Sequence, residues 1–342
     1  MFYLNLKTLT CLPQCGVWTP FSSTTTITLG VLYVATAIIG LVAGVGVLVL
    51  ACLNWKKYFT YPTVLMIYQI IYGIFIMLLG VCQPLLPKDM LCSSPNLLQN
   101  IAHRKATIFC QLNGAITMYS FLAILILWLF HCATIFWGVT WPYHYSVEKT
   151  SERIKYYHIV AVVSSIILPL VFVVTVQLSG GFVLSLPSSP LCGLITPKIF
   201  FYTLILPVDL TLIIGVLLLV STLWNMANVL YRFSDKTKNY KIRASEVKIL
   251  ILISYFFINT LFILTTLNIV LSSQHKQVLD YFLCERAGME AQCPKSGLYK
   301  LQAEKLTFIL SAMSITLFPC VYFVFFLDFR KIYHRCKFKQ MT

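Results

Sequence analysis

The sequence has few charged residues. Asp, Glu, Lys and Arg make up 11% of its 342 residues, whereas a soluble chain carries roughly 25%. Hydrophobic residues make up 58%, which excludes a disordered or collagen-like chain.

The sequence has no Asn-x-Ser/Thr sequon, so N-glycosylation is not expected. It also has no internal repeat, which argues against the paired halves from which many transporters are built.

Motifs for catalysis and cofactor binding are also missing. There is no phosphate-binding glycine loop, nucleophile elbow or His-Glu-x-x-His sequence. His131, His144 and His158 match no metal-ligand spacing, so an intramembrane zinc hydrolase is a minor alternative; these histidines are better explained as hydrogen-bonding residues near a membrane interface. We therefore expect no enzymatic activity, no metal and no cofactor.

Long charge-free runs dominate the chain. Seven of them exceed the ~20 apolar residues that cross a bilayer as a helix, and Asp209 alone interrupts the fifth. The runs are 8–55, 58–87, 106–147, 156–197, 199–231, 249–275 and 306–327. We predict an all-α membrane protein with a seven-transmembrane helix bundle over 27–327, between a short extracellular segment at 1–26 and a cytoplasmic tail at 328–342.

Basic residues predict the orientation of the bundle, because Lys and Arg accumulate in cytoplasmic loops. With the N-terminus outside, sixteen of the 26 Lys and Arg lie inside and ten lie outside. The basic excess is thus explained by topology, and no nucleic acid partner is expected. An even set of cysteines falls on the oxidising outer side and predicts a disulfide framework. These are Cys11, Cys15, Cys82, Cys92, Cys110, Cys192, Cys284 and Cys293. We expect a multi-pass protein of the plasma membrane.

Asp209 is the one ionisable residue deep in a predicted span, two residues after Pro207. An ionisable group inside the membrane is a functional hypothesis by default. Asp209 is therefore our candidate ligand-binding residue. The alternative is a carboxyl group that faces the bundle and hydrogen-bonds to polar neighbours. These two interpretations stay open on the sequence alone.

The predicted inner surface is basic between the fifth and sixth spans and again after the seventh. Such segments bind anionic lipid or a cytosolic partner, although positive-inside topology explains much of the charge. The candidates for transducer coupling are Arg232, Lys241, Arg243, Lys248, Arg330 and Lys331. In the tail, Phe329, Ile332 and Cys336 recur at helical spacing among basic residues. This predicts a short amphipathic helix on the membrane surface, with Cys336 as a lipidation candidate, by palmitate.

Four short motifs resemble the Frizzled/Smoothened family of the G-protein-coupled-receptor superfamily, and the likeness covers most of residues 25–338. They are Tyr61-Pro62 in the first inner loop, Tyr156-Tyr157-His158 at the start of the fourth span, Cys284 with Cys293-Pro294 in the third outer loop, and Arg330-Lys331-Ile332-Tyr333-His334-Arg335 after the last span. Pro207, within the fifth span, also matches the family pattern.

This resemblance implies a receptor that couples an extracellular or intramembrane ligand to a cytosolic transducer, a heterotrimeric G protein. It also implies a Cys110–Cys192 disulfide and a Cys284–Cys293 disulfide. The pairing of Cys11, Cys15, Cys82 and Cys92 stays open.

The sequence departs from the family at two places. Only about 25 residues precede the first span, so the extracellular cysteine-rich domain of the family has no counterpart. The Lys-Thr-x-x-x-Trp signature for Dishevelled is replaced by Val324-Phe325, three residues and Phe329, which argues against recruitment of a Dishevelled-type adaptor.

Other classes compete with this interpretation. Phe318-Pro319-Cys320-Val321-Tyr322 is similar to the last-span Asn-Pro-x-x-Tyr of rhodopsin-like receptors, but their Asp-Arg-Tyr position reads Thr134-Ile135-Phe136. A rhodopsin-like receptor with degenerate motifs is therefore the second choice. A channel or transporter would need a polar pathway. A non-signalling membrane adaptor would keep the fold without the transducer surface.

Overall fold

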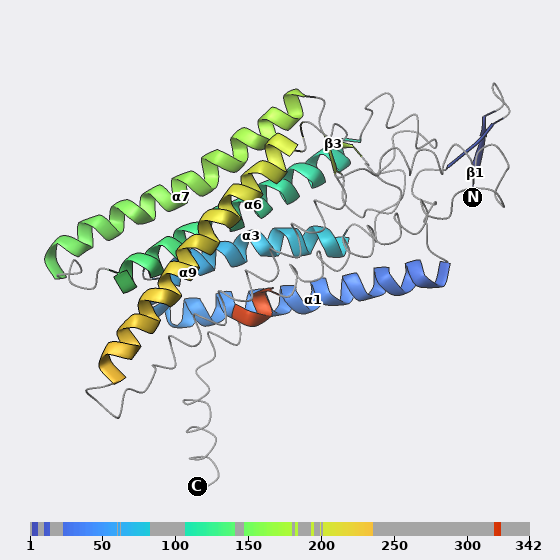
Figure 1. Cartoon of the computed structure of the whole chain (residues 1–342). Helices are drawn as coiled ribbons and strands as arrows, with labels where there is room; N and C mark the ends of the chain where they lie inside the picture. Colours follow the sequence, from blue (N-terminus) through green and yellow to red (C-terminus); the bar gives the residue numbers. More distant parts are fainter. Residues whose placement is uncertain are drawn as a thin grey trace, which may run out of the picture.

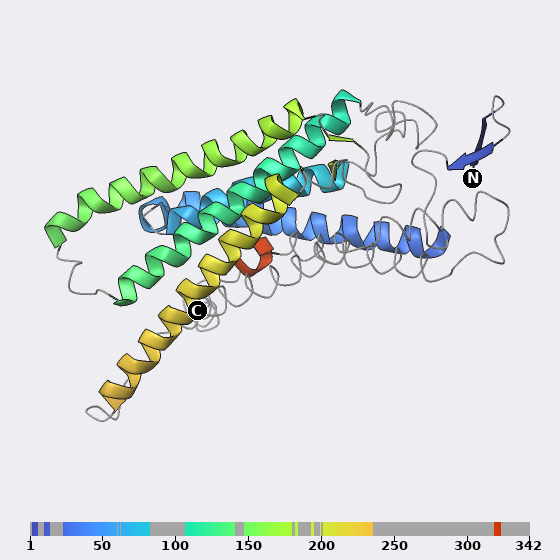
Figure 2. The same ribbon diagram turned by 45° about the horizontal axis from the view of Figure 1, so that its top comes forward.

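The computed structural model describes residues 2–5, 10–13, 23–59, 61, 63–82, 107–140, 147–179, 182–183, 193–194, 199, 201–234 and 318–322, referred to below as the described segments. Five helices in these segments are long and apolar enough to cross a membrane, and they lie side by side as an elongated bundle (Figures 1 and 2). Their bounds are α1 Ser23–Leu53, α3 Thr63–Cys82, α6 Ile108–Thr140, α7 Val147–Leu178 and α9 Leu206–Ser234. Five of the seven predicted spans are thus confirmed as helices.

The described segments contain little of the other two predicted spans. The sixth run, 249–275, lies outside the described segments, and of the seventh, 306–327, only the helical segment 318–322 is described. Below, 318–322 is called the seventh-span segment. Charge-free runs fold as helices because lipid offers no partner to backbone polar groups, so each group must be satisfied within its own segment.

Helix α7 is longer than its charge-free run. It begins at Val147, nine residues before the predicted start at 156, and includes Glu148, Lys149, Glu152 and Arg153. Glu, Lys and Arg are good helix formers, so the helix continues through residues that hydropathy assigns to a loop. The boundary predicted from charge alone is therefore wrong at this end.

The start of α9 is irregular. A π-helix, η3 (Phe201–Ile205), precedes it, and Pro207 is the second residue of α9. Proline has no backbone N–H, so it removes one helical hydrogen bond. Threonine hydroxyls bond to backbone carbonyls on both sides of it: Thr203 Oγ1 donates to the Ile199 carbonyl and Thr211 Oγ1 to the Pro207 carbonyl, each at 2.7 Å. The sequence did not predict this π-helix, which places Asp209 one turn after a helix break.

Four short strands lie outside the candidate spans. Strand β1 (Phe2–Asn5) pairs antiparallel with β2 (Thr10–Pro13), with Phe2 opposite Pro13, and β3 (Phe182–Val183) pairs antiparallel with β4 (Gly193–Leu194). The all-α prediction is therefore right for the helices of the bundle but not for every described residue. Strand β3 packs against α6.

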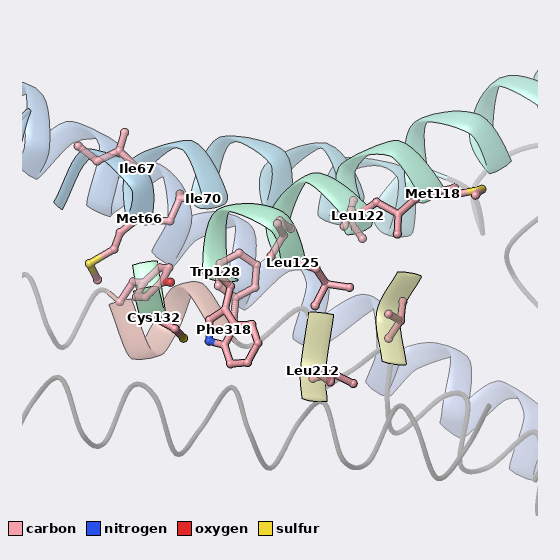
Figure 3. Close-up of a cluster of buried hydrophobic side chains, with 14 of the residues drawn as sticks. Met66, Ile67, Ile70, Met118, Leu122, Leu125, Trp128, Cys132, Leu212 and Phe318 are labelled. Carbon is pink, nitrogen blue, oxygen red and sulfur yellow. The ribbon is translucent and has the colours of Figure 1, made fainter. Parts of the chain in front are cut away.

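Helix α6 occupies the centre of the described bundle, in contact with α3, α7 and α9, while α3 also packs against α1. Figure 3 shows buried side chains from α3, α6, α9 and the seventh-span segment meeting in one cluster, among them Ile70, Leu125, Trp128, Leu212 and Phe318. In contrast, only 28% of the α1 window and 22% of the α7 window are buried. The rest of these apolar faces suits contact with lipid.

Candidate functional site

Successive helices run in opposite directions (Figure 1), so α1, α6 and α9 end where α3 and α7 begin. We call this the Thr140 end, after the last residue of α6, and the opposite one the Cys110 end. Every Lys and Arg in the described segments lies at the Thr140 end: Lys56, Lys57, Lys149, Arg153, Lys155 and Arg232. Within the described segments, the two ends of the bundle therefore differ in their content of basic residues.

Exposed tryptophans lie at the same end. Trp55, Trp137 and Trp224 are 62%, 37% and 69% exposed, and indole rings at such positions favour the boundary between lipid and water. Helix α9 continues for ten residues beyond Trp224, to Ser234, which corresponds to about 15 Å at 1.5 Å per residue. This extension carries Arg232, a predicted transducer-coupling residue, past the level of the tryptophans.

Two of the sequence motifs meet at the Thr140 end. Tyr61 precedes α3, and its ring contacts that of His158 on α7, with the ring centroids 6.1 Å apart and nearly perpendicular. The Tyr68 hydroxyl lies 3.4 Å from His158 Nε2. The Tyr61 hydroxyl also forms a hydrogen bond with the Thr134 hydroxyl of α6. We call these residues, Tyr61, Tyr68, Thr134 and His158, the Tyr61 cluster; it joins three helices.

Further contacts hold the helices together at this end. The rings of Trp137 on α6 and Tyr157 on α7 lie 4.8 Å apart. Asn225 Nδ2 of α9 donates a hydrogen bond to Thr140 Oγ1 of α6 at 3.0 Å. Together with the Tyr61 cluster, these contacts tie α3, α6, α7 and α9 to one another at the Thr140 end, and below we call this arrangement of the four helices the closed arrangement.

A buried hydrogen-bond chain crosses the middle of the bundle. The Tyr322 hydroxyl of the seventh-span segment donates to Gln69 Oε1 of α3, and Gln69 Nε2 lies 3.5 Å from the Ile124 carbonyl of α6. Tyr322 and Gln69 are each 1% exposed. Sequence reasoning did not single out Gln69. The signal for it was that Gln69 is the one amide side chain of α3, because a buried polar group in lipid requires partners.

Asp209 lies in the first turn of α9, in the half of the bundle nearer the Cys110 end. Its side chain is partly buried, and its Oδ1 atom is enclosed without a hydrogen-bond partner among the described residues. The polar neighbour expected under the alternative interpretation is therefore not found for this oxygen. His131 of α6 is 7% exposed, and its Nδ1 atom has no hydrogen-bond partner in the described part of the chain. The interfacial role expected for His131 is wrong, whereas His158 does contact the Tyr68 hydroxyl.

The described cysteines test part of the disulfide prediction. Cys110 in the first turn of α6 takes part in a disulfide, and because Cys192 lies outside the described segments the Cys110–Cys192 pairing stays a prediction. Cys82 is an exposed free thiol at the last residue of α3, which contradicts the disulfide expected for it. A disulfide needs Cα atoms within about 7 Å, and spacing along the chain does not reveal that distance. Cys11 lies on β2; Cys15, Cys92, Cys284 and Cys293 lie outside the described segments.

Other predicted site residues cannot be placed from the described segments. Outside them lie the coupling candidates Lys241, Arg243, Lys248, Arg330 and Lys331 and the lipidation candidate Cys336. Within the described segments, no group of three or more His, Cys, Asp or Glu residues could hold a metal ion. The described candidate site therefore consists of the Tyr61 cluster, the Gln69–Tyr322 chain and Asp209.

Comparison with known proteins identifies the family of the membrane region. Residues 20–337 match the family model of the Frizzled/Smoothened family membrane region. A search of curated proteins found no match. The matched range contains all five described spans, the seventh-span segment and both motifs that meet in the Tyr61 cluster.

Proposed function

The chain belongs to the Frizzled/Smoothened family, and on this basis we propose that it is a seven-transmembrane receptor coupled to a heterotrimeric G protein. Family membership makes it a multi-pass membrane protein of a family of signalling receptors. The prediction of Frizzled-type over rhodopsin-type is confirmed. A ligand acts in such a receptor only by binding one arrangement of the helices better than another. The proposal therefore needs a ligand site, a transducer surface and contacts that differ between arrangements.

The direction of the seventh-span segment supports seven spans. Phe318 packs on Gly73 and Tyr322 bonds to Gln69, four residues earlier on α3. The segment therefore runs antiparallel to α3 and in the same direction as α9. A chain that leaves α9 at one end and returns in the same direction must cross the membrane an odd number of times in between. One crossing by the charge-free run 249–275 meets that condition.

The charge difference between the two ends supports an N-terminus outside the cell. All Lys and Arg of the described segments lie at the Thr140 end, and cytoplasmic loops carry an excess of these residues. Helix α1 runs toward that end, which puts its start on the opposite side of the membrane. The Thr140 end then faces the cytosol, in a receptor that we place in the plasma membrane.

The single observation that carries transducer coupling is the extension of α9 beyond the exposed tryptophans with Arg232 on it. It leads directly into the basic segment that contains Lys241, Arg243 and Lys248. We assign these residues, with Arg330 and Lys331 of the tail, to the transducer surface. Cys336 anchors the tail to the inner leaflet, and anionic lipids are a second partner of the same basic residues.

The test is basal dissociation of heterotrimeric G proteins in cells, across several G-protein classes. Wild type is compared with the Arg243→Ala/Lys248→Ala double variant at matched surface expression. The control is a Lys295→Ala/Lys300→Ala variant, which removes the same charge from the predicted outer side. We expect activity in wild type and in the control, and its loss in the Arg243/Lys248 variant. Equal activity in all three would place the coupling surface elsewhere, and silence in all three would favour an adaptor.

Asp209 is the proposed ligand contact, and the partner that its carboxylate lacks within the described segments would come from the ligand. A hydrogen-bond donor or a positively charged group on the ligand suits this oxygen. Asp209→Asn keeps the size of the side chain and removes its charge. If Asp209 is reserved for the ligand, surface level and basal output stay within about twofold of wild type, because Asp209 Oδ1 has no hydrogen bond to lose within the described segments.

The control on the same helix is Thr211→Val, since the bond that the described segments show for the Thr211 hydroxyl goes to the preceding turn of α9, at the Pro207 carbonyl. Surface level is measured by antibody labelling of intact cells and basal output by the same dissociation assay. A large fall in surface level for Asp209→Asn, with Thr211→Val unchanged, would show that Asp209 is a structural residue.

A further inference from the structure

The seventh-span segment contacts α3 at two points one helical turn apart. Tyr322 donates its hydroxyl hydrogen to Gln69 Oε1, and the ring of Phe318 lies where a side chain on Gly73 would have to be. A Cβ atom on Gly73 would lie only 2.4 Å from Phe318 Cζ. The two contacts fix both the height and the direction of the segment against α3, because Phe318–Tyr322 and Gln69–Gly73 have the same spacing.

Both contacts are fully inside the protein. Phe318 and Tyr322 are 4% and 1% exposed, and Gln69 is 1% exposed. The rings of Phe318 and Tyr322 are perpendicular, with centroids 5.6 Å apart. Gln69 Nε2 extends the chain to the Ile124 carbonyl of α6. Removing one partner of a buried hydrogen bond leaves the other unsatisfied, which costs more than the bond itself contributes.

We propose that the Tyr322–Gln69 hydrogen bond and the Phe318–Gly73 contact form a latch that holds the seventh-span segment against α3 and α6 in the closed arrangement of the bundle. The latch occurs here together with closed contacts at the Thr140 end, Trp137–Tyr157 and Asn225–Thr140. Release of the latch lets the segment move without unfolding the helices around it. This proposal rests on the proposed receptor function only for its effect on signalling, since the latch itself is a property of the bundle.

Two natural cysteines report on the latch. Cys320 lies between Phe318 and Tyr322 and is a partly exposed free thiol, whereas Cys132 of α6 is a fully buried free thiol. Release of the segment exposes Cys320, while Cys132 becomes accessible only if the surrounding core opens. The rate at which N-ethylmaleimide labels each thiol, resolved by mass spectrometry of the full-length purified protein, therefore separates local release from unfolding.

Three variants break the latch in different ways. Tyr322→Phe and Gln69→Leu each remove one partner of the hydrogen bond, and Gly73→Ala displaces the Phe318 ring while leaving both polar groups in place. We expect each to raise the labelling rate of Cys320 about tenfold, with Cys132 unchanged. The Tyr322→Phe/Gln69→Leu double variant should raise the labelling rate by much less than the product of the two single effects, because both changes act on the same bond and together they leave neither partner unsatisfied.

The matched control is Tyr72→Phe. Tyr72 lies one turn from Gln69 on α3, but its ring contacts Tyr119 of α6, 5.9 Å away. This variant removes the same hydroxyl group from a contact between α3 and α6 and should leave Cys320 labelling at the wild-type rate. An equal rise in the control would show that any loosening of α3 exposes Cys320, and this would overturn the latch.

Two further labelling results would overturn it. One is an unchanged Cys320 rate in Tyr322→Phe, and the other is a parallel rise at Cys132, which would show that the bond only supports the fold. For signalling, we expect Tyr322→Phe to raise basal G-protein dissociation at matched surface expression. Suppose that wild type is active and that Tyr322→Phe raises the labelling rate of Cys320 but not basal G-protein dissociation. This result would refute the claim that the latch holds the closed arrangement. Silence of wild type and variants alike would count against the receptor function, and labelling alone would then decide the latch.

Discussion

Helices α6 and α9 pack closely where Gly215 of α9 faces Trp128 of α6. Replacing Gly215 by alanine should force the two helices apart. The Trp128 indole fills the space beside Gly215, so an added Cβ atom would lie 2.4 Å from both Cη2 and Cζ3 of the ring. Trp128 is 2% exposed and belongs to the main buried cluster (Figure 3). A rigid ring packed on all sides cannot give way as a flexible side chain can.

The expected magnitude follows from two opposing effects. Overpacking of a close-packed core costs about 1–3 kcal/mol. Alanine in a helix is more favourable than glycine by roughly 0.5–1 kcal/mol. The net destabilisation for Gly215→Ala is therefore on the order of 1–2 kcal/mol, and the temperature at which half the protein remains folded should fall by a few degrees. The measurement is thermal unfolding of the purified receptor, followed by monodispersity on size exclusion.

Gly30 is the matched control, because an added Cβ atom there meets nothing within 4 Å. Gly30→Ala should leave the midpoint unchanged or raise it slightly. Adding Trp128→Phe to Gly215→Ala should recover part of the loss, since the smaller ring vacates the space that the methyl group needs. If Gly215→Ala proves as stable as Gly30→Ala, the packing of α6 against α9 is not the one described here.

Three further outcomes are expected. Gly80→Ala should lower the same midpoint, because its Cβ would lie 2.7 Å from the Tyr33 hydroxyl oxygen, and Tyr33→Phe should restore it; no recovery would argue against this contact. A double-mutant cycle of Tyr61→Phe and Thr134→Val should give a coupling of about 0.6 kcal/mol, the mean for hydrogen bonds between membrane helices; strict additivity would exclude the bond. Cys110→Ala should reduce antibody labelling of intact cells, because it removes a disulfide; wild-type labelling would contradict that role.

Much of the fold could be predicted from hydropathy. The described helices α1, α3, α6 and α9 lie within or almost within charge-free runs, because a backbone in lipid has little choice other than a helix. Helix ends were less predictable. Charged residues such as Glu148 and Arg153 terminate a hydrophobic run but not a helix, so α7 begins earlier than expected. The π-helix before α9 depends on how the chain packs around Pro207, for which hydropathy carries no signal.

The candidate site was predicted only in part. Asp209 stands out in sequence because a carboxyl group in an apolar run is costly, and the structure adds that its Oδ1 atom has no partner within the described segments. Gln69 was missed because the spans were identified from charge-free runs, and an uncharged amide does not interrupt such a run. Cys82 was assigned to a disulfide because it lies on the predicted outer side, but location does not imply that another thiol is within bonding distance.

The sequence by itself determined that this protein lies in a membrane, which runs form the five described spans and to which family it is similar, because these follow from composition along the chain and from short local motifs. Tertiary structure alone decided which residues meet. Tyr61 and His158 belong to separate motifs in the sequence but to one cluster in the structure. Phe318 contacts Gly73, although more than two hundred residues separate them in the sequence. Contacts between helices depend on their rotation and height relative to one another. A hydrophobic pattern that is apolar on every face leaves both undetermined.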